Sequence, residues 1–323
     1  MSRFKSIILP ILILYLIVTF TACSSESEPH IYIALGDSIA SGYGLVSPTD
    51  RHTYIFYEML RKEGYVYVEE KINKAIEEYT TTDLLELLNE MTDDQLQLFK
   101  NARIITLNIG GNNILVPFAK YLSNRADIEE MLAEEGETAD IEESKSSLNG
   151  RIIDGTLAVW GHVSEWLGDA VSTGRTLLGL FSDELSAELE QGAQIFEKEF
   201  GEIIDWLKTN ARGATIIVNT IYNPIPDKIW IIPVELSNKA DEYIRAMNKI
   251  ILEESETRGF HVADIHAAFS DRDDVMSLSQ FNLNPFGGQF MSVDIIHPNR
   301  DGHTLIAELI YEQYQIARED KKE

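Results

Sequence analysis

The sequence predicts an open α/β fold in which parallel strands form one sheet with helices on both faces. Five short runs are almost wholly apolar, as strands buried on both faces of a parallel sheet are. Segments with helical periodicity lie between these runs, and this alternation favours a parallel sheet. We expect strands at residues 31–35, 65–68, 102–109, 214–221 and 260–265.

The expected helices separate the strands or follow them. They cover residues 53–63, 82–90, 186–209, 237–256 and 302–317. The longest repeats apolar side chains at helical spacing, which predicts one stripe packed against a core. This stripe consists of Leu189, Ala193, Phe196, Phe200, Ile203, Trp206 and Leu207.

A long insertion, at about residues 115–185, lies between the third and fourth expected strands. It is far longer than one crossover helix needs. Its acidic part, 129–147, predicts a mobile loop, whereas 152–181 is too apolar to lie bare in water. The apolar part fits a helical cap on the core, a lid over an acyl-binding groove, or a surface for a partner or membrane.

The charge of the chain excludes some classes of partner. The formal net charge is −26; without Arg3 and Lys5, the only charges in residues 1–22, 25 basic residues face 53 acidic ones. Such a surface repels nucleic acid and argues against electrostatic docking on anionic lipid. The single cysteine, Cys23, excludes an intramolecular disulfide and a cysteine-based metal site.

The first residues have the layout of an export signal. A short basic stretch precedes an almost wholly apolar run that ends at Ala22, which predicts a signal peptide over residues 1–22. Phe20-Thr21-Ala22-Cys23 resembles the lipobox of bacterial lipoproteins, and the resemblance implies that the Cys23 thiol is acylated and that the chain is cut just before it. The alternative is an uncleaved membrane helix, for which the run is short. Either way, we expect residues 23–29 to tether an extracytoplasmic domain at 30–318.

Three motifs with catalytic side chains lie at expected strand ends or before the last helix. Gly36-Asp37-Ser38 follows the first strand, Gly110-Gly111-Asn112-Asn113 follows the third, and Asp294-Ile295-Ile296-His297 precedes the last helix. Ligands of open α/β sheets bind at the carboxyl ends of strands. We therefore expect Ser38 and Asn112 to meet at one crevice. His297 is suited to take the serine proton, and Asp294 to orient its ring.

These motifs resemble those of the SGNH/GDSL hydrolase family, from about Ile31 to Tyr314 without the insertion. The resemblance implies a flavodoxin-like three-layer α/β/α sandwich with a five-stranded parallel sheet. It further implies ester hydrolysis through an acyl-enzyme, with Ser38, His297 and Asp294 as the triad and no metal or cofactor. The Ser38 backbone N–H and the Asn112 side chain would donate to the oxyanion.

Two positions depart from the family pattern. Glu78 lies where the family has a glycine whose N–H completes the oxyanion hole. Its backbone could still donate, but glycine tolerates a positive φ angle more easily than glutamate does, and a lost donor costs on the order of 10²–10³ in rate. Asn113 replaces an aspartate, and its amide can still form local hydrogen bonds.

The sequence therefore predicts a lipid-anchored, extracytoplasmic serine esterase of the bacterial lipoprotein branch of this family. Expected substrates are lipid, lysophospholipid or short-chain esters, with acetyl esters of wall carbohydrates as the alternative. Its membrane contact would be the lipid on Cys23, and no nucleic acid would bind. A second class is a binding protein of the same fold whose turnover is weakened because of Glu78.

Overall fold

The structure is a computed structural model. It describes residues 30–64, 73–118, 121, 183–224, 234–270, 272, 274–277 and 296–321. Several expected features lie outside the described residues. They are the signal peptide with Cys23 and the tether, the strand at 65–68, most of the insertion, and Asp294.

The described residues form a parallel sheet of four strands in the order β1-β2-β3-β4. These are β1 (Ile31–Gly36), β2 (Ala102–Asn108), β3 (Thr215–Asn219) and β4 (His261–Ala263). Gly36 pairs with Asn108, and Asn219 pairs with Ala263, so the strands end near the same edge of the sheet. This carboxyl edge is where the fold predicts a ligand site.

The segment after the expected strand at 65–68 runs along the free edge of β1. Asn73 forms a parallel bridge with Ala34, and the N–H of Lys74 donates to the Ala34 carbonyl at 2.9 Å. Ile76 N–H donates to the Gly36 carbonyl at 3.0 Å. The chain therefore visits the edge beside β1 before it enters β2, as in the flavodoxin-like strand order.

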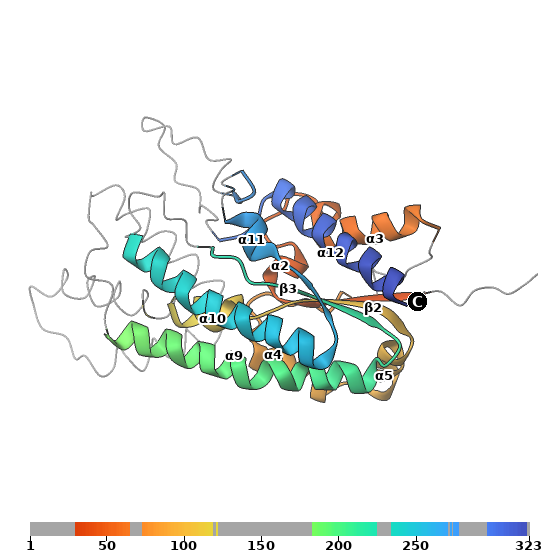
Figure 1. Cartoon of the computed structure of the whole chain (residues 1–323), viewed down its shortest axis with the longest axis horizontal. Coiled ribbons are helices and arrows are strands. Elements are labelled where there is room, and N and C mark those ends of the chain that lie inside the picture. Colours follow the sequence, from red (N-terminus) through yellow and green to blue (C-terminus); the bar gives the residue numbers. More distant parts are fainter. Residues whose placement is uncertain are drawn as a thin grey trace, which may run out of the picture.

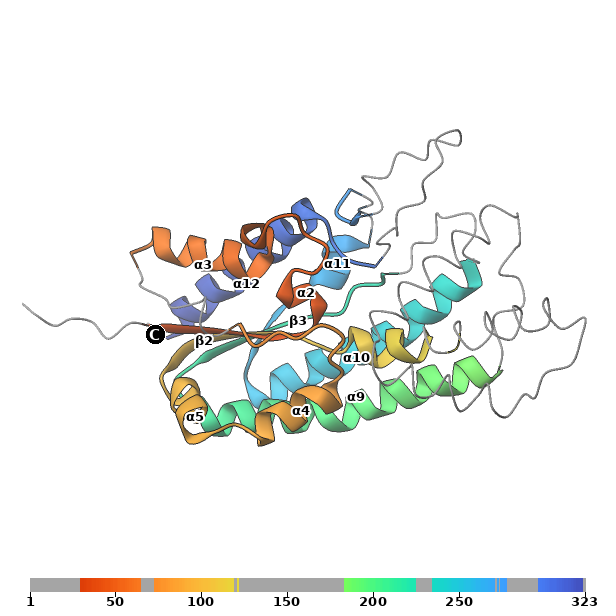
Figure 2. The same cartoon turned by 180° about the vertical axis from the view of Figure 1, so that it is seen from behind.

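Helices cover both faces of the sheet (Figures 1 and 2). On one face lie α3 (His52–Lys62) and α12 (Arg300–Asp320), and on the other lie α4 (Thr81–Asn89), α5 (Asp93–Lys100), α9 (Asp183–Asn210) and α10 (Val234–Arg258). The three-layer α/β/α prediction is confirmed, and five predicted helices match α3, α4, α9, α10 and α12.

Alternate side chains of β1 belong to two different cores. Tyr32 and Ala34 pack in the cluster that includes Phe56 of α3, whereas Ile33 and Leu35 pack in the cluster that includes Phe196 of α9. This follows from the two-residue period of a strand. Both faces of the strand are buried, which explains why its sequence is continuously apolar.

The prediction for the last strand was wrong at its end. The sequence suggested a strand over 260–265, but β4 ends at Ala263. Asp264 is instead the N-cap of α11 (Ile265–Phe269), and its side chain accepts a hydrogen bond from the N–H of Ala267. A carboxylate that satisfies a first-turn N–H favours helix over continued strand.

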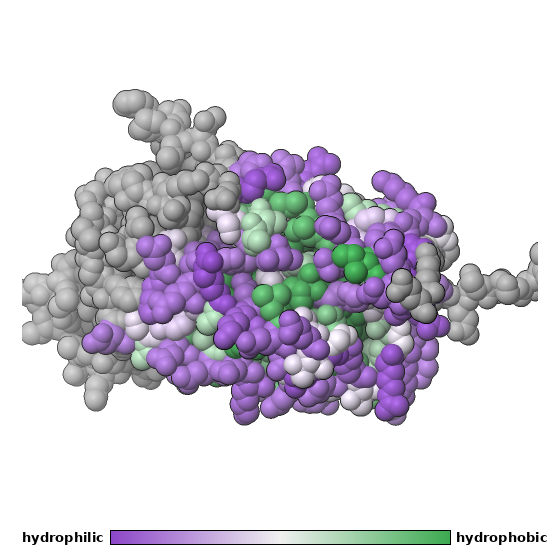
Figure 3. Space-filling view, viewed as in Figure 1, coloured by the Kyte–Doolittle hydropathy of each residue, from purple (hydrophilic) through white to green (hydrophobic). Residues whose placement is uncertain are grey.

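The face of the described residues that Figure 3 shows is mostly hydrophilic. In the view of Figure 3, hydrophobic residues gather in a strip between α10 and α12, along the edge of the sheet. Among the described residues, no helix combines the length and the apolar character needed to cross a bilayer.

Candidate active site

Ser38 stands at the carboxyl end of β1, as the sequence predicts. The strand ends at Gly36, which has a φ of 143°, and a Cβ there would lie 2.1 Å from the Asn108 carbonyl oxygen. Glycine is therefore required for the close approach of β1 to β2. Asp37 caps the short helix α2 (Ser38–Ser41), because its side chain accepts from the Ile39 N–H at 3.0 Å.

The structure brings Ser38 and His297 together from opposite ends of the chain. Nε2 of His297 lies 2.9 Å from Oγ of Ser38, which is hydrogen-bond distance. His297 is 7% exposed, and the ring of Tyr43 lies beside its imidazole with a centroid separation of 4.8 Å. In this geometry the histidine can accept the serine proton directly.

Backbone hydrogen bonds hold the segment that carries His297. Pro298 forms an antiparallel bridge with Met276, and the N–H of Ser277 donates to the His297 carbonyl at 3.0 Å. Asn299 then caps α12 by accepting from the N–H of Gly302. Its side-chain amide donates to the carbonyls of Asp274 and Met276 at 2.7 and 2.9 Å. His297 therefore lies on a segment that several hydrogen bonds hold in place.

Asn112 borders the same cavity as Ser38 and His297. It is 5% exposed and lies at the start of a helical segment over residues 111–118. Its Nδ2 donates to the Tyr79 carbonyl at 3.1 Å. Since an amide nitrogen carries two hydrogens, this bond fixes the side chain and leaves a second N–H for another acceptor.

Asn113 forms local hydrogen bonds, as expected. Its Oδ1 accepts from the N–H of Thr81 at 3.1 Å, and its Nδ2 donates to Oγ1 of Thr81 at 2.9 Å. The Thr81 hydroxyl in turn donates to the Glu199 carboxylate at 2.7 Å. A carboxylate at position 113 could not donate to this hydroxyl, so the amide suits its surroundings.

Glu78 has a backbone conformation that favours glycine. Its φ is 68°, the single positive value of a non-glycine residue in the described part of the chain. The residue does not line the cavity that contains Ser38 and Asn112. Burial raises the pKa of its half-buried carboxyl, and the neighbouring Glu77 raises it further. Its role as an oxyanion donor stays a prediction.

A polar network beneath the site was missed by the sequence analysis. Nδ2 of Asn219 donates to Oδ1 of Asn108 at 3.0 Å, and Nδ2 of Asn108 donates to Oδ1 of Asp37 at 3.0 Å. Burial raises the pKa of Asp37 to about 6, although the hydrogen bonds from Ile39 and Asn108 lower it. The available signal was an asparagine at the end of each of two adjacent apolar strands.

A second buried contact links the helices that follow Ser38 and His297. His303 lies in the first turn of α12 and is fully buried. Its Nδ1 accepts from the backbone N–H of His52, at the start of α3, and also lies 3.2 Å from Nδ1 of His52. Burial lowers the pKa of His303 to about 3, with a smaller effect of His297. We assign the pair a structural role.

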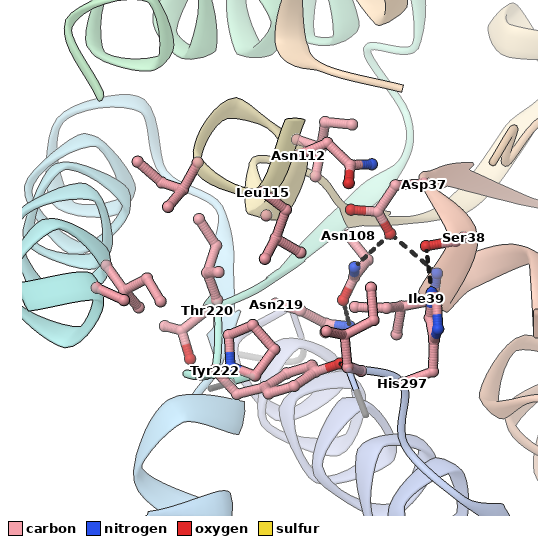
Figure 4. A pocket seen from close by; sticks show the side chains of 18 residues that line it. Asp37, Ser38, Ile39, Asn108, Asn112, Leu115, Asn219, Thr220, Tyr222 and His297 are labelled. Atoms are coloured by element: carbon pink, nitrogen blue, oxygen red, sulfur yellow. Dashed lines mark hydrogen bonds between the residues drawn. The ribbon is translucent and has the colours of Figure 1, made fainter. Parts of the chain in front are cut away.

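The cavity beside Ser38 is lined mainly by apolar side chains (Figure 4). The polar side chains that line it are Asp37, Ser38, Asn108, Asn112, Asn219, Thr220 and His297. The helix α10 contributes Ala240 and Ile244. The other apolar lining residues are Ile39, Ile109, Ile114, Leu115, Ile221, Tyr222, Pro224 and Ile296. Within the described ranges, no three His, Cys, Asp or Glu side chains are placed to bind a metal ion.

The fold and the site together define a class of protein. A serine within hydrogen-bond distance of a histidine, at the carboxyl edge of a parallel sheet covered by helices, is an arrangement typical of serine hydrolases. Residues 34–305 match the model of the GDSL-like Lipase/Acylhydrolase family, and the chain belongs to this family. It is therefore a hydrolase that acts on esters.

Solved structures with the same fold include several lipolytic enzymes. An extracellular lipase from Streptomyces rimosus has a TM-score of 0.54 at 12% identity, with 88% of this chain and 99% of the lipase covered. A phospholipase A1 from Streptomyces albidoflavus NA297 has a TM-score of 0.53 at 13% identity, covering 88% and 99%. A lipase from a goat rumen metagenome has a TM-score of 0.50 at 16% identity, covering 88% and 97%. No curated protein matches the chain.

Proposed function

We propose that this protein is a serine esterase in which Ser38 is the nucleophile and His297 the general base. The observation that carries the proposal is the 2.9 Å contact between Oγ of Ser38 and Nε2 of His297. The buried position of the imidazole beside an apolar cavity supports it further. Asp294, three residues before His297, is proposed as the acid that orients the ring.

The proposed reaction has two halves. Oγ of Ser38 attacks the acyl carbonyl carbon while Nε2 of His297 takes the hydroxyl proton, and the same proton passes to the alcohol that leaves. Water then attacks the acyl-enzyme, gives a proton to His297, and releases the carboxylic acid as Ser38 recovers its hydrogen. The N–H of Ser38 and the second N–H of Asn112 are proposed to stabilise the oxyanion, with the N–H of Glu78 as a third donor.

A labelling experiment tests the nucleophile. A fluorophosphonate probe should modify the full-length protein at Ser38, and Ser38→Ala should lose both labelling and hydrolysis of p-nitrophenyl acetate. Ser41→Ala is the matched control, because Ser41 lies on the same short helix and its hydroxyl donates to the Ser38 carbonyl at 2.9 Å rather than to His297. Full activity of Ser38→Ala would overturn the assignment, and an unlabelled native protein would favour the binding-protein alternative.

The apolar cavity supports acyl esters as substrates, with the acyl chain lying toward α10. In the view of Figure 4, α10 lies across the cavity from Ser38. Ala240 of this helix lines the cavity and is 2% exposed. A larger side chain at this position would occupy space that a long acyl chain needs.

An acyl-length profile tests the substrate proposal, using p-nitrophenyl esters from acetate to palmitate alongside acetylated glycans. Ala240→Leu should shift the preference toward shorter chains, whereas Ala246→Leu, on the exposed side of the same helix, should leave the profile unchanged. Unchanged chain-length preference in Ala240→Leu would remove α10 from the acyl site. Preference for acetylated glycans would favour the carbohydrate esterase alternative.

We also propose that the enzyme is extracytoplasmic and anchored through a lipid on Cys23. The support is the signal-peptide layout of residues 1–22 and the lipobox-like sequence that ends at Cys23. Growth of cells that express the native chain or Cys23→Ala with an alkyne-labelled fatty acid tests this. The native chain should take up the label and the variant should not, and an unlabelled native chain would contradict a lipid anchor.

A further inference from the structure

Tyr222 contacts the residue that precedes His297, whereas the bridge between Met276 and Pro298 involves the residue that follows it. It follows β3 by three residues, is 5% exposed, and packs its ring against Phe269 with a centroid separation of 5.0 Å. Its hydroxyl donates to the carbonyl oxygen of Ile296 at 2.6 Å. Ile296 immediately precedes His297, and both residues line the cavity together with Tyr222.

The backbone around His297 is therefore held on both sides. After the histidine, Ser277 donates to the His297 carbonyl and the N–H of Asn299 donates to the Val275 carbonyl. Before it, the Tyr222 hydroxyl ties the Ile296 carbonyl to the end of β3, and hence to the sheet that also carries Ser38. A rotation of the peptide between Ile296 and His297 would break the tyrosine bond as it moves the imidazole.

We propose that Tyr222 is a positioning residue for the catalytic base. Its hydroxyl fixes the peptide that bears His297, so that Nε2 stays within hydrogen-bond distance of Oγ of Ser38. The inference rests on the proposed function of the Ser38–His297 pair. It adds a residue outside the three motifs, contributed by the central part of the sheet.

The variant Tyr222→Phe removes one oxygen and keeps the ring that packs on Phe269. We expect kcat to fall by about 10- to 100-fold, because small displacements of a catalytic group cost rates of this order. KM should change by less than about threefold, since the ring still lines the cavity. The rate of fluorophosphonate inactivation should fall by a similar factor to kcat, because it depends on the same serine and base.

Tyr32→Phe is the matched control. Tyr32 is also a fully buried tyrosine, and its hydroxyl lies 2.8 Å from Oγ1 of Thr106, in the core between the sheet and α3. Both variants lose one buried hydroxyl hydrogen bond, so their Tm values should fall by similar amounts. Only Tyr222→Phe should lose turnover and probe reactivity, which separates positioning from a general loss of stability.

The imidazole can also be observed without substrate. The ring N–H proton of His297 should shift or broaden in the low-field ¹H NMR spectrum of Tyr222→Phe and remain unchanged in Tyr32→Phe. If Tyr222→Phe keeps the kcat, inactivation rate and spectrum of Tyr32→Phe, the positioning role is wrong. Failure of the underlying function looks different: the native protein would then escape labelling at Ser38, or Ser38→Ala would retain activity.

Discussion

Asp37 is a buried carboxyl that contributes both to the structure of the site and to the pH dependence of the protein's stability. It is 2% exposed, it caps the helix that begins with Ser38, and it accepts a hydrogen bond from Asn108. Burial dominates over these bonds and raises its pKa from 3.8 to about 6. The folded protein therefore binds a proton more tightly than the unfolded chain does.

This shift predicts a loss of stability between pH 4 and 6. Because the folded-state pKa lies above the unfolded one, the contribution of Asp37 is most favourable below pH 4, falls as pH rises to about 6, and then stays constant. Asp37→Asn keeps an oxygen acceptor and does not titrate. Relative to the native protein, the variant should gain up to about 3 kcal/mol in free energy of unfolding across this window.

Urea unfolding at pH 4, 5, 6 and 7 measures the difference. Other titrating groups, including His52 and His303, are present in both proteins and cancel. Parallel stability profiles for Asp37→Asn and the native chain would show that Asp37 ionises in the folded state as it does in the unfolded one.

Glu78 gives a prediction that combines backbone strain with catalysis. A left-handed conformation costs a non-glycine residue roughly 1–2 kcal/mol, so Glu78→Gly should stabilise the protein by about 1 kcal/mol after the larger unfolded-state entropy of glycine is deducted. Glu77→Gly is the control, since Glu77 has no positive φ and should lose stability. Equal effects of the two changes in thermal unfolding would contradict the strain.

The rate of Glu78→Gly separates the two hypotheses about the oxyanion hole. A higher kcat would indicate that the glutamate weakens the hole, through its backbone or its carboxylate. An unchanged kcat would indicate that the present N–H already suffices. The resemblance to the family predicted a glycine at position 78, and this is why the sequence drew attention to Glu78. The positive φ of Glu78 is a conformation that favours glycine.

Among the helices, α9 contains two glycines at which a change to alanine should have different effects on stability. A Cβ on Gly192 would lie 1.9 Å from the backbone oxygen of Asn113, so the helix packs directly on the segment that carries Asn112. A Cβ on Gly201 would meet only the end of the Arg258 side chain, at 3.1 Å. The end of a flexible side chain can move away from the added methyl group, whereas moving a backbone carbonyl in a packed helix costs more free energy.

Gly192→Ala should therefore destabilise the protein by about 2 kcal/mol and reduce kcat, because Asn112 and Asn113 must shift. Gly201→Ala, on the same helix, should be neutral or stabilising by up to about 1 kcal/mol, given the helix propensity of alanine. Thermal unfolding and p-nitrophenyl ester turnover measure both. Equal destabilisation by the two changes would show that α9 does not depend on this contact.

Most elements could be predicted because their residues carry a local signal. The strands are continuously apolar where both faces are covered, and α9 repeats its apolar stripe over the whole helix. The helix α5 could not be predicted in this way, because Phe99 is the one fully buried side chain among its eight residues. Its start is fixed by a capping box between Thr92 and Gln95, a signal weaker than a long amphipathic pattern.

At the scale of the whole molecule, the site is assembled from contacts between distant segments. The motifs identified Ser38, Asn112 and His297 before any geometry was known, and the structure places the three around one cavity. Tyr222 was not predicted, because a tyrosine after an apolar strand has no local signature of its partner. Its hydrogen bond to Ile296 spans 74 positions and forms only when the segment after β3 and the segment before α12 have come together.

The direction of the parallel strands leads to a prediction for the proposed lipid anchor. Ser38 lies at the carboxyl end of β1, whereas the chain enters β1 at Ile31, beside the C-terminal end of α12 (Figure 1). Six extended residues span about 20 Å. Lys321 lies at this entry edge, since its Nζ donates to Oγ1 of Thr215 at the start of β3.

Because the chain enters β1 at one edge of the sheet and Ser38 lies at the other, we can predict how a chain held by Cys23 is oriented on the membrane. On vesicles that carry the lipidated protein, a dye at Lys321→Cys should transfer energy to labelled headgroups more efficiently than a fluorophosphonate dye on Ser38. Equal or reversed transfer would show that the domain lies on its side. In that orientation Ser38 would lie at the edge of the sheet farther from the membrane, and the cavity beside it would open away from the anchoring leaflet. Lipids of the anchoring leaflet would lie behind the enzyme, and esters that arrive from the exterior would meet it first.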